Sequence, residues 1–177
     1  MCNAAPSADT APPLLALGAK VKLVGLQGER VIALEDFFTG PGETVLGPAE
    51  LLTEIQIQEL PPHSAGVYLK HMVRKAMELA IVGVAVVVTL NERKEICKEI
   101  KIALGTAAPT PIRARKAEET LKGKNLDEAR LQEAAEVAAS VTRPSSSIRA
   151  SAEYRREMVK VLTRRAVKQA WQKAQEN

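Results

Sequence analysis

Few residues of this chain have the type and spacing that chemistry needs. The two histidines, His63 and His71, lie in a proline-rich loop and near a predicted strand end, and no cysteine pair at metal-ligand spacing accompanies them. No Ser/His/Asp or Cys/His set is close enough in the sequence to predict a nucleophilic site. The glycine patterns of the Walker and Rossmann phosphate loops do not occur. The residue types alone therefore predict no catalytic group and no metal ligand.

Basic residues are concentrated towards the C-terminus. The chain of 177 residues has 25 Lys and Arg against 21 Asp and Glu. Eight of the basic residues lie between positions 149 and 173, where Glu153 and Glu157 are the only acids. A helix of this composition presents either a solvated charged face or a docking surface for an acidic partner, and the residue types favour the solvated face. Aromatic residues make up only 3%, so a platform that stacks nucleic-acid bases is not expected.

The composition is that of a globular protein. The chain is 46% hydrophobic and 26% charged, which excludes a disordered or collagen-like polypeptide. Its longest apolar run, residues 81–90, has ten residues, whereas a membrane-spanning helix needs roughly 20. The two cysteines, Cys2 and Cys97, are too few for a disulfide scaffold and indicate reduced thiols. We therefore expect a cytoplasmic protein that does not insert into a membrane.

The first sixty residues predict a small antiparallel sheet with short helices. Residues 20–24 alternate between apolar and polar types, a turn follows at Leu26-Gln27-Gly28, and residues 31–34 are apolar, which together predict a hairpin. Residues 53–58 (TEIQIQ) have the alternation of a half-buried strand. Pro61-Pro62 then mark a boundary.

The remainder predicts a three-stranded antiparallel sheet covered by three helices, so the fold class is α+β. Strands are expected around Val67, over residues 81–90 and over residues 100–104. Helices are expected to begin at Thr110-Pro111, at an Asn125 cap and near Ala152. The last helix is expected to bury Tyr154, Met158, Val161, Leu162 and Ala166.

Three long segments resemble one protein family. Residues 1–10 (MCNAAPSADT), 35–50 (EDFFTGPGETVLGPAE) and 148–166 (IRASAEYRREMVKVLTRRA) are similar to the FAD-binding medium subunit of the molybdenum hydroxylases, which include carbon monoxide dehydrogenase and xanthine dehydrogenase. The likeness covers nearly the whole chain. It implies an FAD-dependent oxidoreductase subunit that takes electrons from the iron–sulfur clusters of a small subunit and passes them to an external acceptor. In this family the electrons come from oxidation of the substrate, which takes place on a large molybdopterin subunit.

The resemblance also implies a division of the chain and a set of flavin-binding residues. Residues 1–62 correspond to the C-terminal part of the second FAD-binding subdomain, and residues 63–177 to the C-terminal domain of the flavoprotein. The family places cofactor-binding residues where Asp9, Asn3 and Ser7 stand in the N-terminal loop. Leu52 corresponds to a residue that packs on the isoalloxazine ring, and Lys70 to a lysine near that ring. A cation there favours the reduced flavin, which carries negative charge.

Two departures from the family pattern limit the resemblance. Met77-Glu78 follow Arg74-Lys75 where xanthine dehydrogenases carry an acidic pair, which places the chain nearer the carbon monoxide dehydrogenase branch and argues against an NAD site. The family's two Gly-Gly loops, whose backbone N–H groups hold the FAD pyrophosphate, do not occur in this sequence. We therefore expect a truncated or split flavin subunit that binds FAD weakly or not at all and is inactive alone.

The same residues leave two alternatives open. The first is a non-catalytic α+β module that docks on the iron–sulfur or molybdenum subunit through its basic last helix, without FAD. The second, binding of nucleic acid by that helix, is disfavoured by the scarcity of aromatic residues. A truncated flavin subunit should also expose apolar residues such as Leu14, Leu15 and Phe37, which would favour a homodimer.

Overall fold

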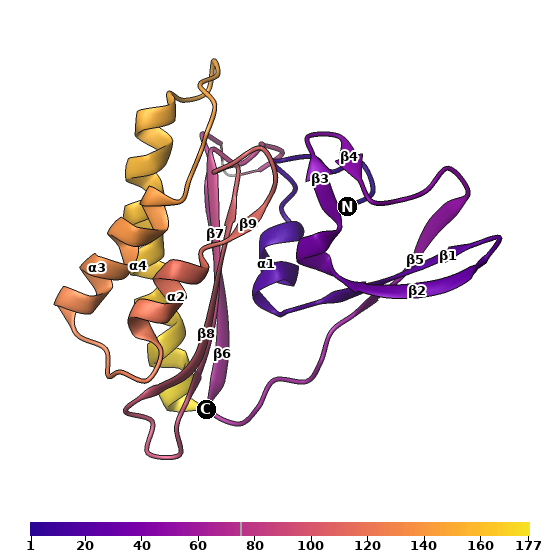
Figure 1. Ribbon diagram of the computed structural model, residues 1–177. Helices are drawn as coiled ribbons and strands as arrows, with labels where there is room; N and C mark the ends of the chain where they lie inside the picture. Colours follow the sequence, from indigo (N-terminus) through magenta and orange to yellow (C-terminus); the bar gives the residue numbers. More distant parts are fainter. Residues whose placement is uncertain (75) are drawn as a thin grey trace.

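The protein has an α+β architecture, as its sequence predicts, with three antiparallel sheets of three, two and four strands among the residues that the structure describes. The computed structural model describes residues 1–74 and 76–177. Three helices cover one face of the four-stranded sheet, and the N-terminal part of the chain lies on the other side, with the first helix in contact with the sheet (Figure 1). The elements are α1 (Ala11–Ala16), β1 (Lys20–Gly25), β2 (Gly28–Ala33), η1 (Leu34–Asp36), β3 (Phe38–Gly40), β4 (Glu43–Thr44), β5 (Glu50–Gln56), β6 (Ser64–His71), β7 (Val82–Leu90), β8 (Cys97–Gly105), β9 (Ile112–Arg113), α2 (Arg115–Leu121), α3 (Glu128–Ser140) and α4 (Ala152–Glu176).

The N-terminal sheet has the strand order β2-β1-β5. Strands β1 and β2 form the predicted hairpin, with Gly25 paired to Gly28 across a two-residue turn. Gly28 has a φ of +125°, a backbone conformation that glycine adopts without steric cost. The strand expected over residues 53–58 is present as β5, which begins earlier, ends at Gln56 and pairs with the other side of β1. Ile55 and Ile57 are 41% and 51% exposed, so the prediction that this strand is half-buried is wrong. The apolar residues before Gly18 form a helix, α1.

The larger sheet has the strand order β6-β7-β8-β9, and all its pairs are antiparallel. Every residue of β7 is buried, because the helices cover one face of this central strand and the N-terminal part covers the other. This explains why residues 81–90 are apolar without alternation. The three predicted strands are present, and the two-residue strand β9 extends the sheet at its edge.

Two of the three predicted helices begin at different residues from those that the sequence signals predict. Helix α2 begins at Arg115, because residues 112–113 that follow the Thr110-Pro111 signal form β9. Helix α3 is capped by Asp127, whose side chain accepts a hydrogen bond from the Arg130 N–H, so the Asn125 prediction is wrong by two residues. Helix α4 begins at Ala152 as predicted. Its Tyr154 and Val161 are 45% and 37% exposed, so the prediction that they are buried is wrong.

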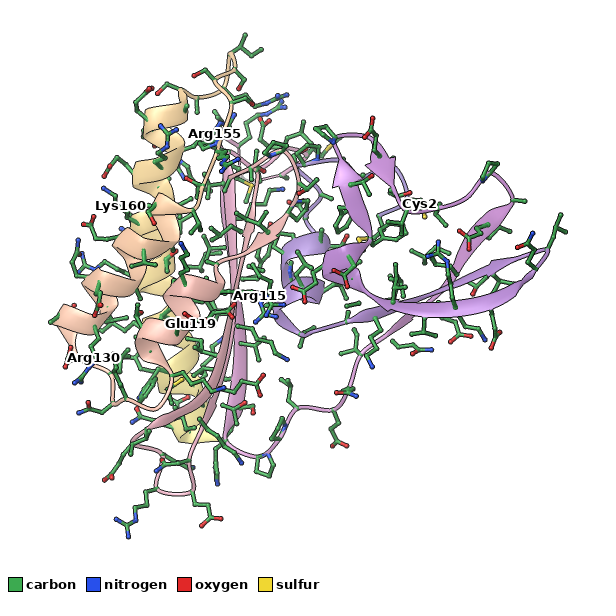
Figure 2. All side chains as sticks on the ribbon, in the orientation of Figure 1. Cys2, Arg115, Glu119, Arg130, Arg155 and Lys160 are labelled. Carbon is green, nitrogen blue, oxygen red and sulfur yellow. The ribbon has the colours of Figure 1, made fainter. Side chains whose placement is uncertain are left out.

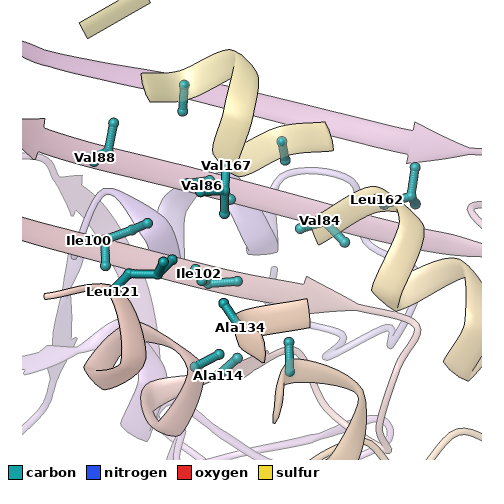
Figure 3. Packing of buried hydrophobic residues seen from close by; sticks show 14 of the residues in the cluster. Val84, Val86, Val88, Ile100, Ile102, Ala114, Leu121, Ala134, Leu162 and Val167 are labelled. Carbon is teal, nitrogen blue, oxygen red and sulfur yellow. The ribbon is translucent and has the colours of Figure 1, made fainter. Parts of the chain in front are cut away.

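Two apolar cores lie on opposite faces of the larger sheet. On the helix side, Val84, Val86 and Val88 of β7 pack with Ile100 and Ile102 of β8 against α2, α3 and α4 (Figure 3). Alanines on the helices let the backbones approach closely.

No helix in the described part of the chain combines the length and the apolar character needed to cross a membrane.

The second core joins the N-terminal part to the other face of the sheet. Leu15 of α1 and Phe37 pack with Ala85 of β7, and both are buried, so the prediction that Leu15 and Phe37 are exposed is wrong. Leu14 is partly buried against the same core. Helix α1 approaches β8 so closely that a Cβ at Gly105 would lie 2.6 Å from a Pro12 ring carbon. Glycine is therefore required there.

A buried ion pair joins α2 to the edge of the sheet. The Glu118 carboxylate accepts hydrogen bonds from the Arg113 guanidinium at 2.8 and 2.6 Å. It also accepts one from the backbone N–H of Ile102 at 2.8 Å, a donor in β8 at the point where β9 has ended. The neighbouring residue of α2, Glu119, is exposed (Figure 2). Glu118 therefore completes the hydrogen bonding of β8.

Candidate functional site

The candidate site lies on the face of β6 that points away from the helices. Val67 and Leu69 pack against the core on the helix side. Because successive side chains of a strand point to opposite faces, Tyr68 and Lys70 project towards the N-terminal part of the chain. Tyr68 accordingly packs against the second core. The period of two along this strand thus brings a phenol and an ammonium group to one face.

An ion pair links this face to the N-terminal loop. The Lys70 ammonium lies 2.7 Å from a carboxylate oxygen of Asp9, although the two residues are 61 positions apart. Lys70 also donates a hydrogen bond to the backbone carbonyl of Glu78 at 2.7 Å. Its side chain is only 16% exposed, whereas that of Asp9 is 49% exposed. The structure therefore brings together two of the five residues expected to bind the cofactor.

Tyr68 completes this group. Its hydroxyl donates a hydrogen bond to the second carboxylate oxygen of Asp9 at 3.4 Å. Burial, followed by the negative charge of Asp9, raises the pKa of the Tyr68 hydroxyl above its ordinary value, so the group remains a neutral donor. The ring passes over Gly83 of β7, where a Cβ would lie 2.7 Å from the hydroxyl. The sequence patterns do not single out Tyr68, although its position two residues before Lys70 on a strand is a signal for it.

Asn3 and Ser7 lie in the same N-terminal loop as Asp9. Asn3 is exposed and Ser7 is partly buried. The backbone of the loop is held at two points. The Ala4 carbonyl accepts a hydrogen bond from the Gly42 N–H at 3.3 Å, and the Pro6 carbonyl accepts one from the Thr106 N–H at 3.1 Å. The loop therefore lies between the N-terminal part and the end of β8, with the Asp9 carboxylate directed at β6.

Leu52 belongs to a different sheet. It lies on β5, opposite Leu23 of β1, and is partly buried against the second core. Its expected contact with a flavin ring stays a prediction. An apolar cavity of about 240 Å³ lies elsewhere on the candidate face, between α1 and strands β6 and β7, and Tyr68 lines it together with Leu17 and Val87.

The residues that suggest a family branch surround Glu78. Its carboxylate pairs with the Arg74 guanidinium at 2.9 Å, which lowers the pKa of Glu78, and Arg149 lies 3.6 Å away. Lys75 lies outside the described residues, so the expectation that depends on Arg74-Lys75 stays a prediction.

Among the residues that the structure describes, no three His, Cys, Asp or Glu side chains form a group that could hold a metal ion. The site offers a cation, a carboxylate and a phenol, a set suited to binding and orienting a polar ligand.

Comparison with known families gives two matches that together span most of the chain. Residues 1–59 match the FAD-binding domain in molybdopterin dehydrogenases. Residues 67–170 match the C-terminal domain of the carbon monoxide dehydrogenase flavoprotein. The second match alone covers more than half of the 177 residues.

Individual proteins agree with these families. The chain is 37% identical over 168 residues to the carbon monoxide dehydrogenase medium chain of Afipia carboxidovorans, covering 95% of this chain and 57% of that one. It is 33% identical over 171 residues to a putative xanthine dehydrogenase FAD-binding subunit of Escherichia coli K12, covering 96% and 58%. A structure of reconstituted carbon monoxide dehydrogenase from Oligotropha carboxidovorans superposes with a TM-score of 0.90 at 36% identity, covering 96% and 58%. The chain thus spans somewhat more than half the length of these relatives.

Proposed function

The chain belongs to the family of FAD-binding medium subunits of the molybdenum hydroxylases, and on that premise we propose that it is an electron-transfer subunit of such an oxidoreductase. It would receive electrons from the iron–sulfur clusters of a small subunit and deliver them to an external acceptor. FAD is the cofactor of this family, and when bound it supplies the electron-carrying chemistry. A molybdopterin-containing large subunit would be the other partner and would select the substrate.

The observation that carries this proposal is the Lys70–Asp9 ion pair on the candidate face. Lys70 is largely withdrawn from water and is oriented by two acceptors, the Asp9 carboxylate and the Glu78 carbonyl. A cation held in this way favours electron density on a neighbouring flavin ring. The half-exposed Asp9 carboxylate leaves acceptor capacity for ribityl or ribose hydroxyl groups. The donor set therefore fits a flavin nucleotide.

We further propose that residues 1–62 and 63–177 are the two functional parts of the chain. Their boundary lies in the exposed segment that connects β5 to β6. Residues of the proposed site come from both parts: Asn3, Ser7, Asp9 and Leu52 from the first, and Lys70 from the second. Binding of FAD would then depend on the contact between them.

Titration of FAD into the purified protein tests this function. Because the family's Gly-Gly loops do not occur in this sequence, we expect weak binding, which Lys70→Met should weaken further by about tenfold or more. Asp9→Asn should weaken it as well, because Lys70 loses the partner that orients it. Lys98→Met is the matched control, since Lys98 is an exposed lysine of β8. Equal FAD affinity in Lys70→Met and Lys98→Met would overturn the assignment of the site.

A second candidate function is favoured by the basic surface of α4. In this alternative the chain is a non-catalytic module that docks on the iron–sulfur or molybdenum subunit without binding FAD. Flavin content separates the two candidates. A protein that takes up no FAD, yet co-purifies with both partner subunits in stoichiometric amounts, would support the module and overturn the flavoprotein.

A further inference from the structure

A groove runs between α3 and α4, in the helix layer that covers the sheet. It has a volume of about 370 Å³ and is lined by Glu128, Leu131, Val161, Arg164, Arg165 and Lys168. These helices cover the face of the sheet opposite to Tyr68 and Lys70. The groove is therefore separate from the proposed flavin site, and its binding properties do not depend on whether the chain holds FAD.

The groove combines an apolar floor with a cationic rim. Leu131 is buried, and Val161 is 37% exposed although it lies on a helix that packs against the core. Val161, Arg164, Arg165 and Lys168 have the spacing i, i+3, i+4, i+7, which places them along one stripe of α4. This stripe of an apolar residue followed by cations is not needed for packing against the sheet.

The positive charge of the rim is only partly neutralised. Glu128 lies 3.0 Å from the Lys168 ammonium and 3.4 Å from the Arg164 guanidinium, and the hydrogen bond from Lys168 lowers the pKa of Glu128. Glu128 is therefore ionised and is shared between two cations. Arg165 has no ion-pair partner among the residues that the structure describes. The rim thus carries three cations against one carboxylate.

We propose that this groove binds an acidic, amphipathic helical segment of a partner polypeptide. An apolar side chain of that segment packs on Val161 and Leu131, and its carboxylates pair with Arg165 and with the two cations that now share Glu128. Recognition of an amphipathic helix by a groove uses the same combination of apolar anchors and flanking charge. A partner bound here leaves the Asp9–Lys70 face uncovered.

The chemistry of the groove distinguishes a polypeptide from a nucleic acid. Glu128 lies within the groove and neutralises part of the positive charge on which binding of a phosphate backbone would depend. The apolar floor has no use in binding a phosphate backbone, which is held mainly by charge. Both features favour an acidic polypeptide.

Fluorescence anisotropy with a defined probe tests the proposal. The probe is a fluorescein-labelled synthetic helical peptide that carries a leucine stripe flanked by glutamates. We expect saturable binding that weakens by about tenfold or more in Arg165→Glu. Arg156→Glu is the matched control, because it makes the same charge change at an exposed position of α4 outside the groove. The fluorescence of Trp171, buried in α4, verifies that each variant is folded.

Several outcomes would overturn the proposal. Equal losses in Arg165→Glu and Arg156→Glu would indicate attraction by net charge alone. Unchanged binding of a peptide with serine in place of leucine would show that the apolar floor is not used. Absence of peptide binding, or tighter Arg165-dependent binding of a short DNA duplex, would reject an acidic polypeptide as the occupant.

Discussion

Replacement of Glu118 should destabilise the fold far more than replacement of its neighbour. The Glu118→Ala substitution removes the carboxylate that pairs with the Arg113 guanidinium, and the Arg113 side chain is only 12% exposed. Removing one partner of a buried pair costs about 3–5 kcal/mol. The Ile102 N–H also loses its acceptor, and an unsatisfied buried donor costs about 1–3 kcal/mol. Because Arg113 can turn partly to solvent, we expect a total near the lower end, about 4 kcal/mol.

Conservative replacement separates the two contributions. Glu118→Gln keeps an oxygen for the Ile102 N–H but removes the charge that pairs with Arg113, so we expect a loss of about 2–3 kcal/mol. Glu119→Ala removes an exposed carboxylate from the same helix and should change the free energy of unfolding by less than about 0.5 kcal/mol. Glu119→Ala should therefore be the most stable of the three variants, Glu118→Gln should be intermediate, and Glu118→Ala should be the least stable.

Equilibrium unfolding in urea measures these differences. Trp171 is the only tryptophan and is buried in the core that α2 shares, so its fluorescence reports the transition. The slope of free energy against urea should be the same in all variants if the native and unfolded states keep their compactness. A loss of about 4 kcal/mol would be a large part of the roughly 5–15 kcal/mol that typically stabilises a domain. Equal stabilities of Glu118→Ala and Glu119→Ala would refute the assigned role.

Three further predictions concern other groups. The exposed Cys2 should react with a thiol reagent at about pH 8, whereas Cys97, whose pKa burial raises to about 12, should react only on unfolding; equal rates would contradict this. The hydrogen bond from the Arg30 guanidinium, and then that from the Gly47 N–H, lower the pKa of Glu50 from its ordinary value of 4.5 to about 2. The ionised carboxylate therefore stabilises the fold when the pH is above 4.5, and this stabilisation is lost as the pH falls towards 2. The stability difference between wild type and Glu50→Gln should shrink over that range in acid titrations. Gly83→Ala should lower the melting temperature, because its methyl group meets the Tyr68 hydroxyl, and Tyr68→Phe should restore part of the loss.

Most of the fold could be predicted from local patterns. The hairpin turn before Gly28 and the β-branched run of β7 are properties of adjacent residues, so the sequence indicates them directly. Strand β9 could not be predicted, because two residues contain no period and its pairing with β8 is a tertiary contact. The exposure of Val161 could not be predicted for a related reason: helical spacing shows which residues share a face but not how much of that face a neighbouring helix covers.

Only part of the candidate site could be predicted from the sequence. Family resemblance supplied Asp9 and Lys70 as separate residues, while their contact depends on how a loop and a strand 61 positions apart are brought together. Tyr68 has no chemical motif around it, and its role emerges from the space that Gly83 leaves for its ring. The roles of Asn3, Ser7 and Leu52 rest on the resemblance.

The close packing of α1 on β8 affects how the two parts of the chain stay associated. The peptide between β5 and β6 is exposed, while α1 is embedded on the sheet that the later strands build. If a protease cleaves this connection, the two fragments should therefore stay associated. Pro12 packs closely on Gly105, the two fragments share the second core, and Asp9 forms an ion pair with Lys70. These non-covalent contacts, rather than the connecting peptide, hold the N-terminal part on the sheet.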